Sequence, residues 1–586
     1  MQIKIKTIPK RKTKRAIKRI TQVLMTFLFI SLLSNCNQNT STNTTFDTII
    51  RGGTIYDGLG GNPFVGDIGI NNDKIAVIGD LSNADAKNNI DASGKAVSPG
   101  FINMLSWAVQ TLAVDGRGLS DLKQGVTLEV YGEGLSMGPM SEALKQFELE
   151  SFRYRDIPFE VEWRSLNDYL EFLETKGVSV NVASFVGATT LRINHIGFDN
   201  RAPTGDELEA MKKDVRVAME EGAMGLGSSL IYAPAFFAKT DELVAMAKVV
   251  GEYDGMYISH LRSEGAKLIE ALDELIYIAE SAGVSAEVYH LKAAGSENWH
   301  KLPEVFSKIA EARKRGLNIT ADMYPYTAAA TGLDAAMPPW VQEGGYQAWA
   351  SRLKDPSIRE KVIEAMQIPT KDWENLYLGA GAEGILFIGF KNPDLRKYVG
   401  KTLAQVAQER SQSTADTAID LVIEDGSRVE AVYFLMSEEN VRKQVILPWV
   451  SFGSDELTYD PKLDRPYSAA HPRAYGSFAR VLGKYVREEK MLSLAEAIRK
   501  MSYLPATNLK LRQRGALQVG YYADIVVFDP NTIQDHATFT ESHQLATGVE
   551  HVWVNGEQVL KNGEHTGATP GRVVRGPGWL GWSSGE

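Results

Sequence analysis

The chain has 586 residues, of which 44% are hydrophobic and 23% are charged, and its formal net charge is −10. This composition is typical of a globular protein that is long enough for a large core and more than one domain. The first 20 residues hold nine lysines and arginines and no acid, so the rest of the chain carries a formal charge of −19. A body this acidic is a poor binder of nucleic acid, and we expect its partner to be a small molecule.

The first 36 residues have the pattern of a targeting segment. A basic run precedes VLMTFLFISLL, an apolar run of 11 residues that is too short to cross a bilayer comfortably. The run ends in LLSNC, which resembles a bacterial lipoprotein signal whose cysteine becomes the lipidated first residue of the mature chain. We therefore expect a signal peptide over 1–36, a lipid anchor on Cys36, a polar linker over 37–45 and a location in the bacterial cell envelope, facing the periplasm or the exterior. A plain cleaved signal or an uncleaved anchor is the alternative.

Two β-rich segments lie at opposite ends of the body, over 46–97 and 510–575. Both contain short apolar-alternating runs separated by Gly, Asp and Asn turns, and both are short, so we expect them to pair in one small domain. Between them, over 98–509, strands alternate with helices, which indicates βα units and a parallel sheet. The expected strands include NVASFVG, GAMGLGSS, GMYISH, SAEVYH, LNITADMYPY, EAVYFLM and PWVSFGSD. A segment over about 335–430 interrupts this rhythm and is predicted to be an insertion that could cover a site.

Histidines end two neighbouring strands of the βα region. GMYISH ends in His260 and SAEVYH ends in His290, with a helical pattern between them. The carboxyl ends of parallel strands meet at one edge, which is where an α/β barrel builds its site. Neutral imidazole is a good zinc ligand, so the pair indicates a metal site. The alternative is two unrelated polar residues at strand ends.

Many segments along the body together resemble the amidohydrolase superfamily, and in particular its N-acyl-D-amino-acid deacylase (D-aminoacylase) branch. These segments are IIRGGTIYDG, SPGFI, GVTLEVYGEG, YISHLRSE, YHLKAAG, DMYPYTA, SFGSDE, HPRAYGSFARVLG and ADIVVFDP. The resemblance implies an α/β fold: a distorted (β/α)8 TIM-like barrel with a small β-sandwich domain formed by both chain ends.

Several metal-binding positions of the family are changed in this chain. After SPGF the family usually has a His-x-His pair, where this chain has Leu105 and Trp107. Neither side chain can bind a metal. A family histidine near VGATTLR is replaced by Ala188. The resemblance therefore implies that the metal site using this pair is absent.

The other metal site of the family keeps a complete ligand set here. Its cysteine corresponds to Glu133, and its two later histidines correspond to His260 and His290. A carboxylate is an acceptable zinc ligand, so these three residues imply one Zn²⁺ per chain, with a fourth position for water.

The resemblance also implies a catalytic residue and a substrate-binding set. Asp455 in SFGSDE matches the catalytic aspartate, which would take a proton from metal-activated water and pass it to the leaving amine. A helix N-cap is the alternative role for this aspartate. Lys292 and Arg473 match positions that hold the carboxylate of the substrate. Either Tyr324 or Tyr326 would donate a hydrogen bond to that carboxylate or to the oxyanion, and the sequence does not decide between them.

The expected function is that of a zinc-dependent amide hydrolase that deacylates N-acyl-D-amino acids. Two alternatives stay open. The first is an amidohydrolase acting on another amide, such as a dipeptide or a cyclic amide. The second is a catalytically inactive binding protein on the same scaffold, which the changed positions would favour.

Overall fold

The computed structural model describes residues 45–151, 160–464 and 468–582. The predicted signal peptide, its Cys36 and the linker as far as residue 44 lie outside the described residues. Within these described ranges, none of the helices combines the length and the hydrophobicity needed to cross a bilayer.

A barrel of parallel strands forms the centre of the molecule. Its strands are hydrogen-bonded in the orders β17-β13-β12-β11-β10-β9 and β6-β7-β8. Their bounds are β6 (Phe101–Asn103), β7 (Val126–Tyr131), β8 (Asn181–Ser184), β9 (Val186–Gly187), β10 (Gly225–Ser229), β11 (Met256–His260), β12 (Ser285–Val288), β13 (Ile319–Met323) and β17 (Val450–Phe452). The ring closes where Asp455 donates its backbone N–H to the Leu105 carbonyl at 2.8 Å. The predicted distorted (β/α)8 barrel is confirmed.

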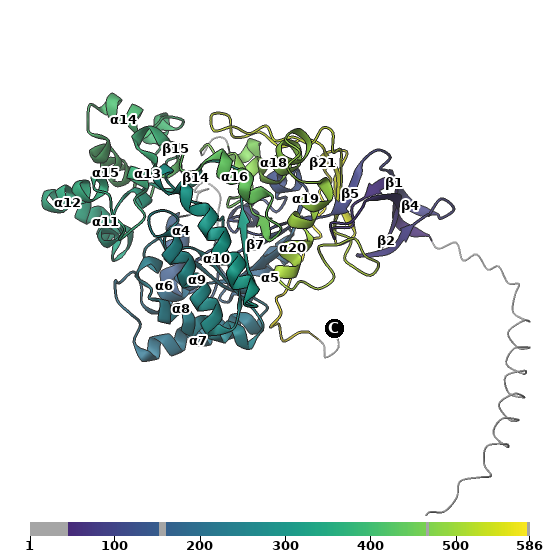
Figure 1. Cartoon of the computed structure of the whole chain (residues 1–586), viewed down its shortest axis with the longest axis horizontal. Coiled ribbons are helices and arrows are strands. Elements are labelled where there is room, and N and C mark those ends of the chain that lie inside the picture. Colours follow the sequence, from purple (N-terminus) through teal and green to yellow (C-terminus); the bar gives the residue numbers. More distant parts are fainter. Residues whose placement is uncertain (1–44, 152–159, 465–467, 583–586) are drawn as a thin grey trace, which may run out of the picture.

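Amphipathic helices cover the outside of the barrel. Figure 1 shows α7 (Gly205–Glu220), α8 (Thr240–Glu252), α9 (Leu268–Ala282) and α10 (Leu302–Lys314) packed side by side. Helix α9 buries a stripe of apolar residues at helical spacing, which explains why it packs on the strands. It ends at Gly283, whose φ of 68° suits the left-handed C-terminal cap. The helix between the two histidine-bearing strands therefore follows directly from the sequence pattern.

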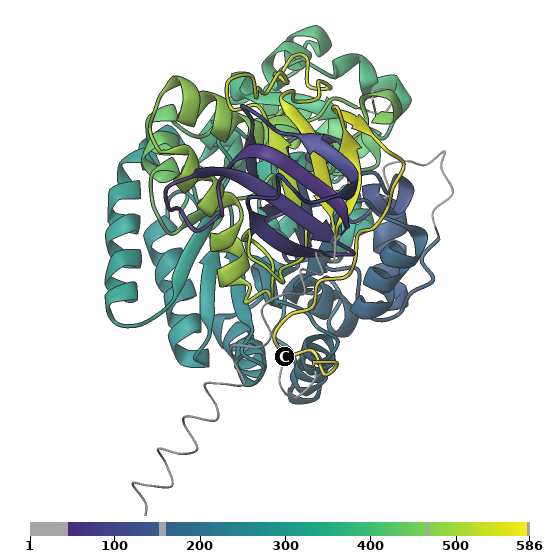
Figure 2. The same ribbon diagram turned by 90° about the vertical axis from the view of Figure 1, so that its right-hand side faces the viewer.

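The strands of the two chain ends form one nine-stranded sheet beside the barrel. Figure 2 shows the N-terminal strands lying next to the C-terminal ones. The bounds are β1 (Phe46–Ile55), β2 (Phe64–Asn71), β3 (Lys74–Gly79), β4 (Ala86–Asp91), β5 (Ala96–Pro99), β18 (Ile525–Phe528), β19 (Val549–Val554), β20 (Glu557–Lys561) and β21 (Glu564–His565). The ends join where β5 and β18 pair antiparallel, with Val97 opposite Val527. Side chains from both ends, such as Ile50, Ile68 and Trp553, share one buried cluster, so the sheet folds over a common core like a sandwich.

An insertion with its own core follows β13. The strands β14 (Ala329–Gly332), β16 (Glu430–Tyr433) and β15 (Ile385–Gly389) form an antiparallel sheet in that order. Helices α11 (Gly345–Leu353), α12 (Pro356–Gln367), α14 (Leu403–Arg410) and α15 (Thr414–Asp425) pack with it, at the end of the molecule far from the small β-domain (Figure 1). The prediction that EAVYFLM is a barrel strand is wrong, because its first residues form β16. A short apolar run has the same pattern in either sheet, so its partner cannot be inferred from it.

Candidate active site

The residues expected at the site follow the carboxyl ends of barrel strands. Glu133 comes two residues after β7, His260 ends β11, His290 comes two residues after β12, and Asp455 comes three residues after β17. Because these ends face the same side of the barrel, the four side chains line one cavity of about 670 Å³.

Glu133, His260 and His290 form a compact donor cluster. The Glu133 Oε1 atom lies 3.1 Å from His260 Nδ1 and 2.9 Å from His290 Nε2. All three side chains are buried, and one donor atom from each lies within 4.8 Å of the others. Zinc binds such two-histidine, one-carboxylate sets in catalytic sites. The three residues therefore fit the ligand set of one catalytic zinc ion.

The charges of this cluster depend on one another. Burial raises the pKa of Glu133, but the two imidazoles outweigh burial and hold that pKa well below its usual range. Burial and Lys292 lower the pKa of His290, but the Glu264 and Glu133 carboxylates outweigh them and bring it to about 10. A metal ion bound at His290 Nε2 would displace any proton held on that nitrogen.

Glu264 and Lys292 contact the far side of the imidazoles. Glu264 Oε1 lies 3.1 Å from His290 Nδ1, and its Oε2 lies 3.6 Å from His260 Nε2. A metal-binding histidine needs such a partner to fix its ring. Lys292 Nζ lies 2.6 Å from Glu264 Oε1 and 2.7 Å from His290 Nδ1. Lys292 lines the cavity, as expected for substrate binding, but its ammonium group is already paired with Glu264.

The Asp455 carboxylate has a partner at each oxygen. Trp107 donates its indole N–H to Asp455 Oδ1 at 3.2 Å and to Glu133 Oε2 at 3.0 Å. The Arg473 guanidinium pairs with Asp455 Oδ2 at 2.7 Å. Burial is the main reason that the pKa of Asp455 lies above its ordinary value, and Arg473 opposes that shift. A carboxyl group with a raised pKa is a better proton acceptor than an ordinary aspartate.

The two candidate tyrosines are placed differently. Tyr324 lines the cavity, and the Arg473 guanidinium lies 4.5 Å from its ring centre. The hydroxyl group of Tyr324 is buried and has no hydrogen-bond partner in the described structure. The hydroxyl group of Tyr326 instead donates to the Pro472 carbonyl at 3.3 Å, and Tyr326 is not among the residues that line the cavity. Of the two tyrosines, Tyr324 is the one that lines the cavity.

Comparisons with known proteins identify relatives of this chain. The chain is 32% identical to the D-aminoacylase of Alcaligenes xylosoxydans xylosoxydans over 530 residues, covering 90% of this chain and 97% of that protein.

The chain belongs to the D-aminoacylase family of amidohydrolases.

Two other findings support this membership. Residues 450–560 match a family model described as "Amidohydrolase family". The structure of N-acyl-D-glutamate deacylase from Bordetella bronchiseptica, complexed with zinc and a phosphonate mimic of the tetrahedral intermediate, superposes with a TM-score of 0.74 at 29% identity, covering 91% of this chain and 100% of that one. A D-aminoacylase structure with a TM-score of 0.74 and 30% identity, covering 90% of this chain and 100% of that one, is described as having a binuclear centre with one-metal activation and second-metal attenuation.

Some cavity residues were missed by reasoning from the sequence. Trp107 was read only as a lost metal ligand, yet it binds two carboxylates. Ser229, the last residue of β10, lines the cavity with a buried hydroxyl group that has no partner in the described structure. Tyr232 also lines the cavity, and its ring packs against His260 at 5.4 Å between centres. Ser229 could have been found from the sequence, because it is a polar residue at the end of a predicted strand.

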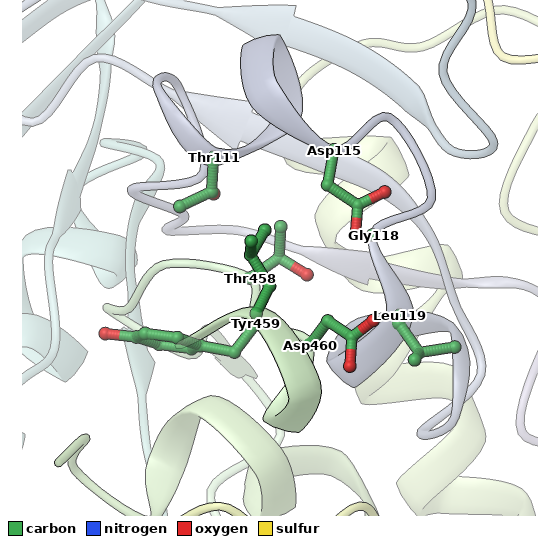
Figure 3. Close-up of a pocket in the computed structure, with 8 residues that line it drawn as sticks. Thr111, Asp115, Gly118, Leu119, Thr458, Tyr459 and Asp460 are labelled. Atoms are coloured by element: carbon green, nitrogen blue, oxygen red, sulfur yellow. The ribbon is translucent and has the colours of Figure 1, made fainter. Parts of the chain in front are cut away.

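A second, much smaller cavity lies between residues 111–119 and 458–463 (Figure 3). Its volume is about 10 Å³, which is enough for roughly one water molecule. Arg117 pairs with Asp115 at 2.7 Å and with Asp460 at 2.6 Å, so both carboxylates already have a cation. This cavity is too small for a substrate.

Proposed function

We propose that this protein is a zinc-dependent hydrolase of linear amides that removes the acyl group from N-acyl-D-amino acids. Its products would be a carboxylic acid and a free D-amino acid. The observation that carries the proposal is the cluster of Glu133, His260 and His290, with Asp455 on the same cavity. The relatives described as D-aminoacylase and N-acyl-D-glutamate deacylase support it.

Glu133, His260 and His290 would hold a zinc ion, which would supply a lowered pKa for water and polarisation of the scissile carbonyl. The protein supplies the geometry for this chemistry. Glu264, 3.1 Å from His290 Nδ1, fixes the ring so that Nε2 faces the cluster. The buried and charged Glu133 completes the donor set.

Asp455 moves the proton in this proposal. Its carboxylate accepts a proton from the attacking water while the new C–O bond forms. It then donates the proton to the amide nitrogen as the C–N bond breaks, so the amine leaves neutral and Asp455 returns to its starting state. The raised pKa of Asp455 suits both transfers.

Arg473 and Tyr324 provide the recognition of a substrate carboxylate. A guanidinium group binds a carboxylate through two parallel hydrogen bonds. The free hydroxyl group of Tyr324 lies beside it and can donate a third. Burial of Arg473, which is 2% exposed, strengthens such a contact by excluding water.

The cavity also has an apolar wall that fits an apolar group of the substrate. Met137, Ile193 and Phe198 line it, together with Phe147, whose ring centre lies 5.8 Å from that of Phe198. Burying an apolar acyl chain or side chain there removes it from water, which contributes about 25 cal/mol per Å².

One assay separates this function from its alternatives. Purified protein with its zinc content measured is offered N-acyl-D-amino acids, their L enantiomers, dipeptides and cyclic amides. We expect turnover of the D compounds by protein that contains zinc. Turnover of only dipeptides or only cyclic amides would assign another amidohydrolase activity. Ligand binding without turnover by metal-free protein would assign a binding protein.

We also propose that Cys36 carries a lipid anchor and that the enzyme works in the bacterial cell envelope. The basic and apolar runs before LLSNC support this location.

A further inference from the structure

Trp107 lies between the two carboxylates of the site. Its indole N–H is 3.0 Å from Glu133 Oε2 and 3.2 Å from Asp455 Oδ1. The backbone fixes this position, because the Trp107 N–H donates to the Glu456 carbonyl at 2.9 Å and Ser106 forms a β-bridge with Glu456. The segment that carries the indole is thus hydrogen-bonded to Glu456, the residue that follows Asp455.

Each of the four oxygens of these carboxylates has a partner. Glu133 Oε1 faces the two imidazoles, and Asp455 Oδ2 faces Arg473. The other two oxygens, Glu133 Oε2 and Asp455 Oδ1, both face the indole nitrogen of Trp107. Two carboxylates that face one point repel each other unless a cation or a hydrogen-bond donor lies between them.

A cation bridging Glu133 and Asp455 would occupy the point where the indole nitrogen lies. The indole nitrogen is a donor only and has no lone pair for a metal. It relieves the repulsion with a neutral group and blocks the position against a second metal ion. It also fixes the direction in which each carboxylate points.

We propose that Trp107 is a positioning residue that replaces a second cation: it holds the site at one metal ion and aims Glu133 and Asp455. The positioning role rests on the proposed function. The metal count does not, because it is measured without substrate.

A cobalt(II) titration of the metal-free, full-length protein tests the metal count. Visible absorbance should reach its end point at about one equivalent in the wild type. Trp107→His, which places an imidazole beside both carboxylates, should take up a second equivalent. Trp449→Phe, a tryptophan change just before β17 at the opposite end of the strand from Asp455, should stop at one. A wild type that binds two ions, or a Trp107→His variant that still stops at one, would overturn the proposal.

The Trp107→Phe variant tests the positioning role. It keeps an aromatic ring and removes the N–H. We expect kcat to fall by about 10-fold or more, since a hydrogen bond to a charged group is lost, with KM within about twofold. Unchanged kcat with one bound metal would overturn the positioning role. If the wild type turns over no acyl-amino acid yet binds a single cobalt ion, the proposed function fails while the metal-count inference stands.

Discussion

Asp455 and Arg473 form a buried ion pair on the wall of the cavity, with 2.7 Å between Oδ2 and Nη1. Asp455 follows β17, and Arg473 begins α18 (Arg473–Arg480). The guanidinium also lies against the ring of Tyr324. If a substrate carboxylate pairs with Arg473 in place of Asp455, Asp455 loses its cation and becomes a stronger base. The pair therefore links recognition of the carboxylate to the proton transfer.

Both Asp455 and His290 have left-handed backbone conformations, with φ of 52° and 34°. For a residue with a side chain this costs about 1–2 kcal/mol. Such strain persists when the surrounding structure over-determines the position, as the contacts around Asp455 and His290 do here.

Replacement of Asp455 by asparagine should remove turnover but keep the metal. The amide cannot accept the proton, so we expect kcat to fall by about 100- to 10,000-fold. Zinc content, measured by elemental analysis, should stay at the wild-type value because Asp455 is outside the donor cluster. Retention of more than a tenth of the wild-type kcat would exclude Asp455 as the base.

Replacement of Glu133 by glutamine should weaken zinc binding by at least about 10-fold, because the charged ligand becomes neutral. Competition with a chelator measures the affinity. Glu148→Gln is the matched control: Glu148 is buried in the same cavity but lies outside the donor cluster. Equal zinc affinity for the two variants would contradict the ligand role of Glu133.

Zinc binding should release protons and tighten as the pH rises. The pKa of His290 is raised to about 10 in the metal-free site, so its imidazole is protonated at pH 8 and must lose that proton to bind zinc. We expect at least one proton released per zinc at pH 8, from His290 and from any water that the zinc ionises. Calorimetry in two buffers with different ionisation enthalpies measures the number. Release of no proton at pH 8 would show that the imidazole is already neutral.

The Arg473→Lys variant should bind the substrate carboxylate poorly. A lysine cannot reproduce the two parallel hydrogen bonds, so we expect KM to rise by about 10- to 100-fold. The matched test substrate is the same N-acyl-D-amino acid with its carboxylate replaced by a carboxamide. For this substrate the substitution should raise KM much less. An equal rise in KM for both substrates would assign Arg473 a structural role.

The Cys36→Ser variant tests the anchor. With the cysteine removed, no lipid can be attached, so incorporation of a labelled fatty acid should stop. The protein should then move out of the membrane fraction if the signal is still cleaved. Persistent labelling of the variant would place the lipid elsewhere.

The sequence by itself determined which strands carry the site. The helix between His260 and His290 has a local apolar periodicity, and the βα spacing puts both residues at one sheet edge, so neither inference needs a distant contact. Resemblance to known sequences then supplied Glu133 and Asp455 as partners. All these signals lie within short stretches of chain.

Only the tertiary structure decided which groups contact one another across the cavity. Tyr324 and Tyr326 are two residues apart, and just one of them lines it. The bonds from Trp107 to Glu133 and Asp455, and the pair between Asp455 and Arg473, join different strands and helices. Likewise, β16 (Glu430–Tyr433) pairs with two strands of the insertion and not with the barrel. Short-range periodicity fixes the direction of a side chain on its own element, whereas its partner depends on how distant elements pack.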